Sequence, residues 1–72
     1  MDNLIDKRKE TTVVGIILYL GGPERMAGKL GVTVGAISHW KVSGIIPADR
    51  AIQIEEITKG KLRAVRMPRA KI

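Results

Sequence analysis

Cysteine and phenylalanine are absent from the 72 residues, and histidine, tryptophan and tyrosine occur once each. Without cysteine the chain cannot form disulfides or a cysteine-based zinc site, and one histidine cannot build a histidine-rich metal site. The longest apolar run, residues 13–20, contains a glycine and is far shorter than the roughly 20 residues of a membrane span. We therefore expect no metal, cofactor or membrane segment. The charged beginning of the sequence lacks a signal-peptide pattern, which predicts a cytoplasmic location.

The familiar arrangements of catalytic residues are missing as well. There is no cysteine nucleophile, and Glu55 and Glu56 are neighbours that point in different directions on a helix, so they do not form a catalytic carboxylate pair. No glycine-rich phosphate loop follows a strand pattern. We expect neither an enzyme nor a small-molecule substrate.

Acidic residues are lacking from one part of the chain. The net charge is +6, and basic and acidic residues balance within residues 1–10 and within residues 11–58. Residues 59–72 contain six basic residues and no acidic residue, so the whole excess lies there. Such a segment predicts either an electrostatic arm for nucleic acid or a solubilising tail.

Proline and glycine divide the middle of the chain into two short helix patterns, residues 23–30 and 34–42. Pro23 suits the first position of a helix, and Gly31 suits a left-handed stop. Thr33 stands where its hydroxyl can cap the second helix. Two helices joined by a tight turn that contains glycine form the outline of a helix-turn-helix.

The second predicted helix has two different faces. At about 100° per residue, Ala36, Ile37 and Trp40 share one arc, which we expect to be buried. The opposite arc consists of Val34, Gly35, Ser38, His39 and Val42. A small, almost uncharged face is unusual where solubility is the only requirement. It suits close approach to another surface, such as the major groove of DNA.

A first helix is predicted over residues 11–20, capped by Thr11 or Thr12, because apolar residues recur there at helical spacing. A strand remains the alternative, since the segment is rich in residues that favour strands. We expect Val14 and Leu18 to cover the core. Their exposure would instead suggest a protein contact.

The segment after the motif is predicted to close the core. Ile45 and Ile46 form an apolar loop, Pro47 blocks continuation of the preceding helix, and residues 48–58 form the last helix. The inward face of that helix is expected to contain Ala51, Ile54 and Ile57. Residues 62–65 alternate weakly, which leaves a short C-terminal strand and an irregular tail both open.

At this point a family becomes identifiable. The run of residues 21–61 resembles the Cro-type repressors of lambdoid phages and their YdaS-like relatives in prophages. The matching features are Ala27, Trp40 and the short runs 30–32, 36–38, 46–48 and 50–52. The resemblance implies a single all-α domain with the compact four-helix architecture of lambda repressor. Residues 1–10 would be an N-terminal arm, 11–58 the helical core and 59–72 a basic tail.

The resemblance also implies a function, namely a sequence-specific repressor that places helix 34–42 in the major groove of double-stranded DNA, as a homodimer on a two-fold operator. The base-facing positions would be Val34, Gly35, Ser38 and His39. Phosphate contacts are expected at the rim of the motif and in the basic tail, from Arg25, Thr33, Lys41, Lys61 and Arg63. The dimer contacts would be Leu62 and Val65.

Two further expectations follow. The alternative function is an antitoxin-like or excision-type prophage regulator that also binds a protein partner. Removal of residues 61–72 is expected to weaken DNA binding and its salt dependence strongly.

Overall fold

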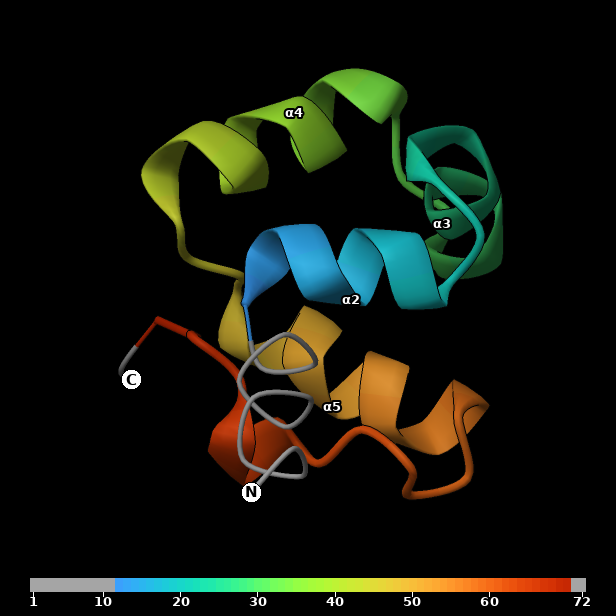
Figure 1. Ribbon diagram of the computed structural model, residues 1–72, viewed down its shortest axis with the longest axis vertical. Coiled ribbons are helices and arrows are strands. Elements are labelled where there is room, and N and C mark those ends of the chain that lie inside the picture. Colours follow the sequence, from blue (N-terminus) through green and yellow to red (C-terminus); the bar gives the residue numbers. More distant parts are fainter. Residues whose placement is uncertain (1–11, 71–72) are drawn as a thin grey trace, which may run out of the picture.

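The computed structural model describes residues 12–70, and helices dominate this part of the chain. The elements in order are α2 (Val13–Tyr19), α3 (Pro23–Leu30), α4 (Val34–Ser43), α5 (Ala48–Ile57) and the 3-10 turn η1 (Ala64–Arg66). Figure 1 shows α2 in the middle of the molecule, α4 above it, α5 below it, and α3 to one side, seen almost along its axis. The predicted all-α architecture is confirmed.

Side-chain caps and a left-handed glycine set the helix boundaries. The Thr12 hydroxyl accepts a hydrogen bond from the Gly15 N–H at 3.0 Å, which fixes α2 as a helix and excludes the strand alternative. The Thr33 hydroxyl accepts from the Ala36 N–H at 3.1 Å in the same way. Gly31, with φ of 73°, ends α3 in the left-handed conformation, as predicted.

The core combines the inward faces of the four helices with the loop before α5 and the segment after it. Its largest fully buried side chains come from α2, α3, α4, the loop and α5, one from each: Ile16, Met26, Ile37, Ile46 and Ile54. Smaller and more peripheral members surround them, among them Val13, Ile17, Leu20, Ala27, Leu30, Trp40 and Ala51. The buried arc predicted for α4 is confirmed at Ile37 and Trp40, with Ala36 partly buried at its edge.

The inward face of α5 differs from the prediction at one residue. Ala51 and Ile54 are buried, but Ile57 is 41% exposed and Thr58 is buried in its place. Positions 51, 54 and 58 follow the i, i+3, i+7 rule, whereas 57 lies at the edge of that stripe. Burial of the threonine is possible because its hydroxyl donates to the Ile54 carbonyl at 2.8 Å and accepts from the Leu62 N–H at 3.1 Å.

The loop before α5 fills the core with one isoleucine and not with two. Ile46 is fully buried, whereas Ile45 is 48% exposed. The Ile46 N–H donates to the Pro68 carbonyl and the Ala70 N–H donates to the Ile46 carbonyl, both at 2.8 Å. This pairing fixes the extended backbone, in which neighbouring side chains point to opposite sides.

The basic C-terminal segment, residues 59–70, folds back onto the helices. Leu62, Ala64 and Met67 are buried in the core. The Glu55 carboxylate accepts a hydrogen bond from the Ala64 N–H at 2.7 Å and lies 3.9 Å from Arg63 Nε. The strand considered for residues 62–65 is wrong, because this stretch enters η1. The N-terminal arm and residues 71–72 lie outside the described residues.

Two apolar residues of α2 that were expected to cover the core are exposed. Val14 is 48% exposed and Leu18 is 71% exposed, because the other face of this short helix already fills the core. Among residues 12–70 no helix is long and apolar enough to cross a membrane.

Candidate nucleic-acid interface

The two helices of the motif meet at a turn that has little freedom. The N–H groups of Gly31 and Val32 both donate to the Ala27 carbonyl, at 2.9 and 3.0 Å, so the chain leaves α3 in a fixed direction. Figure 1 shows the result, in which α4 runs across the molecule while α3 points nearly along the line of sight. This steep crossing is the arrangement of a helix-turn-helix.

A pair of polar side chains from α5 holds the C-terminal end of α3. Arg50 Nη1 donates to the Leu30 carbonyl at 3.1 Å, and Gln53 Nε2 donates to the same oxygen at 3.2 Å. Arg50 Nη1 also lies 2.8 Å from Gln53 Oε1. A cation near the negative end of a helix dipole is stabilising. Sequence reasoning missed this contact, because no local pattern links residue 30 to residues 50 and 53.

The inner face of α4 fixes the helix against the core. Ile37 is 1% exposed and Trp40 is 6% exposed, with Ala36 packed at the edge. Gly44 ends the helix with φ of 76° and donates its N–H to the Trp40 carbonyl at 2.7 Å. Rotation of α4 about its axis would pull an indole ring out of the core, so the helix presents one outer face.

That outer face carries all four predicted base-facing residues. Val34, Gly35, Ser38 and His39 are exposed, and Val42 beyond them is 87% exposed. Within residues 12–70 no hydrogen bond or ion pair involves the side chains of Ser38 and His39. The outer side of α4 forms the edge of the molecule in Figure 1, with no other element over it. The structure therefore brings these residues together on one accessible surface.

Gly35 has no structural reason to be glycine. An added Cβ would have Thr33 Oγ1 at 3.7 Å as its nearest neighbour, which is an ordinary contact, and its φ is not in the left-handed region. Gly28 on α3 also has open space around it. No other element of the described chain comes close enough to require a glycine at this position.

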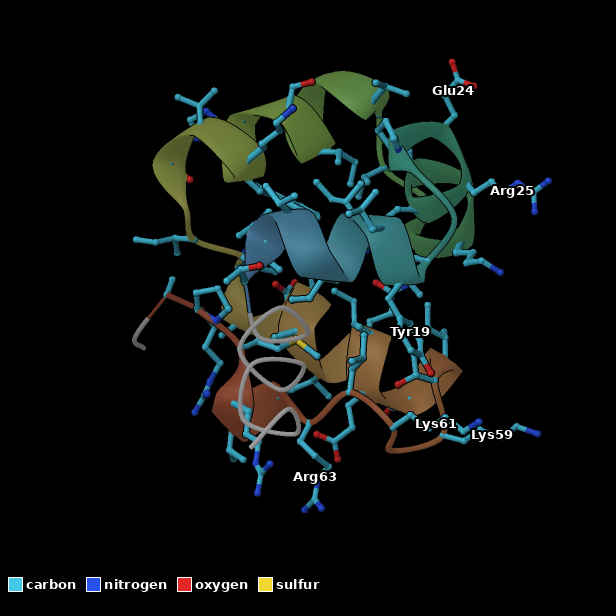
Figure 2. All side chains as sticks on the ribbon, viewed as in Figure 1. Tyr19, Glu24, Arg25, Lys59, Lys61 and Arg63 are labelled. Atoms are coloured by element: carbon cyan, nitrogen blue, oxygen red, sulfur yellow. The ribbon has the colours of Figure 1, made fainter. Side chains whose placement is uncertain are left out.

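The residues predicted to contact phosphates lie in three separate regions of the molecule. Thr33 and Lys41 are exposed in the cap and the last turn of α4, beside the base-facing residues. Lys61 and Arg63 lie on the α5 side of the molecule, across the core from α4 (Figure 2). Arg25 leaves α3 sideways, away from α4, whereas Glu24 points toward the end of the molecule that carries α4 (Figure 2).

The two predicted dimer contacts also separate. Leu62 is 3% exposed and belongs to the core of its own chain, which corrects its assignment as a surface contact. Val65 is 71% exposed. In the sequence, the spacing of Leu62, Ala64 and Met67 was the available signal that this segment packs inward.

The fold and this surface define a helix-turn-helix DNA-binding domain, with an anchored second helix and a bare outer face. The family model described as "DNA-binding transcriptional regulator Cro" matches residues 12–71. The chain belongs to this family of DNA-binding transcriptional regulators, as its resemblance to Cro-type repressors implied. No curated protein and no solved structure gives a significant match. The family match does not support the alternative of a regulator that also binds a protein partner.

Proposed function

We propose that this protein is a sequence-specific repressor that inserts α4 into the major groove of double-stranded DNA. The observation that carries the proposal is the exposed outer face of α4, whose polar side chains have no partner within residues 12–70, in a chain of the Cro family. A major groove is about 12 Å wide and admits one helix. The proposed place of action is the cytoplasm of a bacterial host cell, where the DNA lies. The proposed role involves no catalysis.

The residues of the outer face divide the readout between shape and hydrogen bonding. Val34 offers methyl groups that can contact the methyl of thymine, and Gly35 lets the helix backbone come close to the bases. Ser38 and His39 each donate or accept hydrogen bonds. Because only two side chains can hydrogen-bond to bases, phosphate contacts and DNA shape contribute much of the affinity.

Phosphate contacts flank the inserted helix. The Thr33 hydroxyl accepts the capping hydrogen bond from Ala36 N–H, which leaves its own proton for a phosphate oxygen. Lys41 supplies a positive charge one helix length away, in the last turn of α4. The two contacts position α4 along the groove, and the bases then specify the sequence.

A single domain of this size covers one half-site, so we propose that two copies bind a two-fold operator with half-sites about 34–36 Å apart. Val65 is the exposed candidate for the contact between the copies. An isologous contact of this kind would place the same residue of each copy at the two-fold axis or close to it.

Selection of bound sequences from random duplexes, at two salt concentrations, tests the proposal. We expect a palindromic consensus, and we expect Val34→Ala to relax it at one position in each half-site, by less than the roughly 1–3 kcal/mol of a bidentate hydrogen-bonded pair, because valine makes only apolar contacts. Val14→Ala is the matched control, because Val14 is a valine of similar exposure, 48% against 43%, on a different helix. A featureless pool from the unaltered protein would contradict sequence-specific binding.

A further inference from the structure

A second charged surface lies away from the outer face of α4. A cleft of about 700 Å³ opens between α3 and the chain that follows α5. We call it the basic cleft and define it by Tyr19, Arg25, Lys29, Lys59 and Lys61, which line it. Figure 2 shows Arg25, Tyr19, Lys59 and Lys61 along one side of the molecule. No carboxylate of residues 12–70 lines the cleft, and its four cations come from two distant parts of the chain.

Among residues 12–70 no carboxylate forms an ion pair with the cations of the basic cleft. The one ion pair among the described residues joins Arg63 to Glu55, and neither of these residues lines the cleft. Arg63 points away from the cleft, at the lower end of the molecule in Figure 2. Four cations gathered in a concave surface repel one another and concentrate a positive field, which attracts an anion.

Lys59, in the cleft, has a backbone conformation that is uncommon for a residue with a side chain. Lys59 has φ of 56°, and it is the one residue other than glycine with positive φ in the described chain. The position follows the C-terminal end of α5, where glycine is the preferred residue because it has no Cβ. Conformations of this kind persist where the surrounding structure requires them and gather at functional sites. Here the strain accompanies a cation in the cleft.

The Arg25 side chain is also directed by its surroundings. A Cβ built on Gly21 would lie 2.8 Å from Arg25 Cδ, so the absence of a side chain at residue 21 lets the arginine lie over the turn between α2 and α3. The guanidinium group thus extends from the side of α3 and not toward α4 (Figure 2). Arg25, which was expected at the rim of the motif, therefore lines the cleft.

We propose that the basic cleft binds the phosphodiester backbone of duplex DNA that flanks the operator. The inference rests on the proposed function, because in helix-turn-helix docking the first helix of the motif crosses the backbone, and α3 is that helix. Because Lys61 lies across the core from α4, duplex DNA beyond the half-site would have to bend around α3 to reach the cleft, at a cost that the phosphate contacts offset. The cations and the Tyr19 hydroxyl are the donors for phosphate oxygens.

Binding is measured on two duplexes, one ending at the outer edges of the half-sites and one extended by about 10 base pairs, one helical turn, at each end. The unaltered protein is expected to bind the longer duplex several-fold more tightly and with a steeper salt dependence. Lys59→Gln should reduce the slope on the longer duplex by about 0.9, the value for one phosphate contact, and leave the short duplex unaffected. Lys59→Gln/Lys61→Gln should remove most of the length effect.

Two variants serve as controls. Arg66→Gln removes one charge from an exposed residue outside the cleft and should keep the length effect. Lys59→Gly relieves the positive φ while it removes the charge, so its melting temperature should not fall, although its binding to the longer duplex should. A loss of affinity in this variant therefore cannot be attributed to unfolding.

The outcomes separate the two proposals. If the short duplex is bound without sequence preference, the proposed function fails. If the short duplex is bound specifically but the longer one no more tightly, the flanking-DNA inference is wrong. It is also wrong if Arg66→Gln reduces binding to the longer duplex as strongly as Lys59→Gln does. If the length effect is absent and inorganic tripolyphosphate shifts the NMR signals of Tyr19, the inference is wrong and the cleft is a site for small anions.

Discussion

At the scale of single residues, glycine is used in this protein for two different reasons. Gly31 and Gly44 have positive φ at the ends of the two motif helices, where a Cβ would be strained. Gly28 and Gly35 lie inside helices, have space for a Cβ and destabilise them relative to alanine. For Gly35, on the outer face of α4, the proposed function offers a reason, because a side chain there would stand between the helix and the bases.

Gly35→Ala and Gly28→Ala test this explanation as a pair. Each substitution should stabilise the protein by about 0.5–1 kcal/mol, since alanine is the better helix former. Thermal unfolding should show a similar rise in melting temperature for both. Only Gly35→Ala should weaken DNA binding, as measured by titration of the selected operator. Equal affinities for the two variants would mean that residue 35 is not in close contact with DNA.

At the scale of secondary-structure elements, the geometry of the motif depends on a helix outside it. Arg50 and Gln53 of α5 donate to the carbonyl of Leu30, the last residue of α3. The oxygen lies next to the left-handed Gly31, so the hydrogen bonds fix the point from which the chain turns into α4. The α5 helix therefore supports the motif through this polar contact as well as through the core.

Arg50→Met should destabilise the fold by only about 0.5–1.5 kcal/mol, the net value of one hydrogen bond, because Gln53 still donates to the Leu30 carbonyl. The double variant Arg50→Met/Gln53→Met should cost more than the sum of the single variants, since either residue alone still satisfies the oxygen. Chemical denaturation of the four proteins gives the coupling free energy. Strict additivity would show that the two side chains act independently.

At the scale of the whole molecule, the charge excess belongs to a folded segment. Five of the six basic residues of 59–72 lie in the described part of the chain, where they alternate along the sequence with three buried apolar residues, Leu62, Ala64 and Met67. Thr58 and Glu55 fix the backbone of the same segment by accepting hydrogen bonds from Leu62 N–H and Ala64 N–H. The basic tail is thus attached to the core over residues 61–70, whether it serves as an electrostatic arm or as a solubilising segment.

Deletion of residues 61–72 should therefore unfold the protein and not only weaken DNA binding. The loss of buried leucine and methionine side chains costs about 2–5 kcal/mol each, against a total stability of about 5–15 kcal/mol for a typical domain. Circular dichroism should show a loss of cooperative melting. The control Lys61→Gln/Arg66→Gln, which removes two exposed charges from the same segment, should melt as the unaltered protein does. A truncated protein with unchanged melting would contradict this view of the C-terminal segment.

The two helices of the motif, their order and the outer face of α4 were predictable from the sequence, whereas the helix at residues 13–19 still competed with a strand. These features follow from local sequence signals. Pro23 begins a helix, Gly31 ends it in the left-handed conformation, and Thr33 caps the next helix. The 3.6-residue period places Trp40 and Ser38 on opposite faces of α4. Local patterns can be identified without knowing what packs against them.

The places where distant residues meet could not be predicted from the sequence, because they depend on how the helices pack. Thr58 is buried on the inner face where Ile57 was expected, and its burial depends on a hydrogen bond to residue 62. Ile46 is buried while Ile45 is exposed, and this depends on backbone pairing with residues 68–70. The basic cleft joins Arg25 and Lys29 to Lys59 and Lys61 across thirty residues of chain or more. Such contacts have no periodicity in the sequence, because they arise from the way whole helices pack.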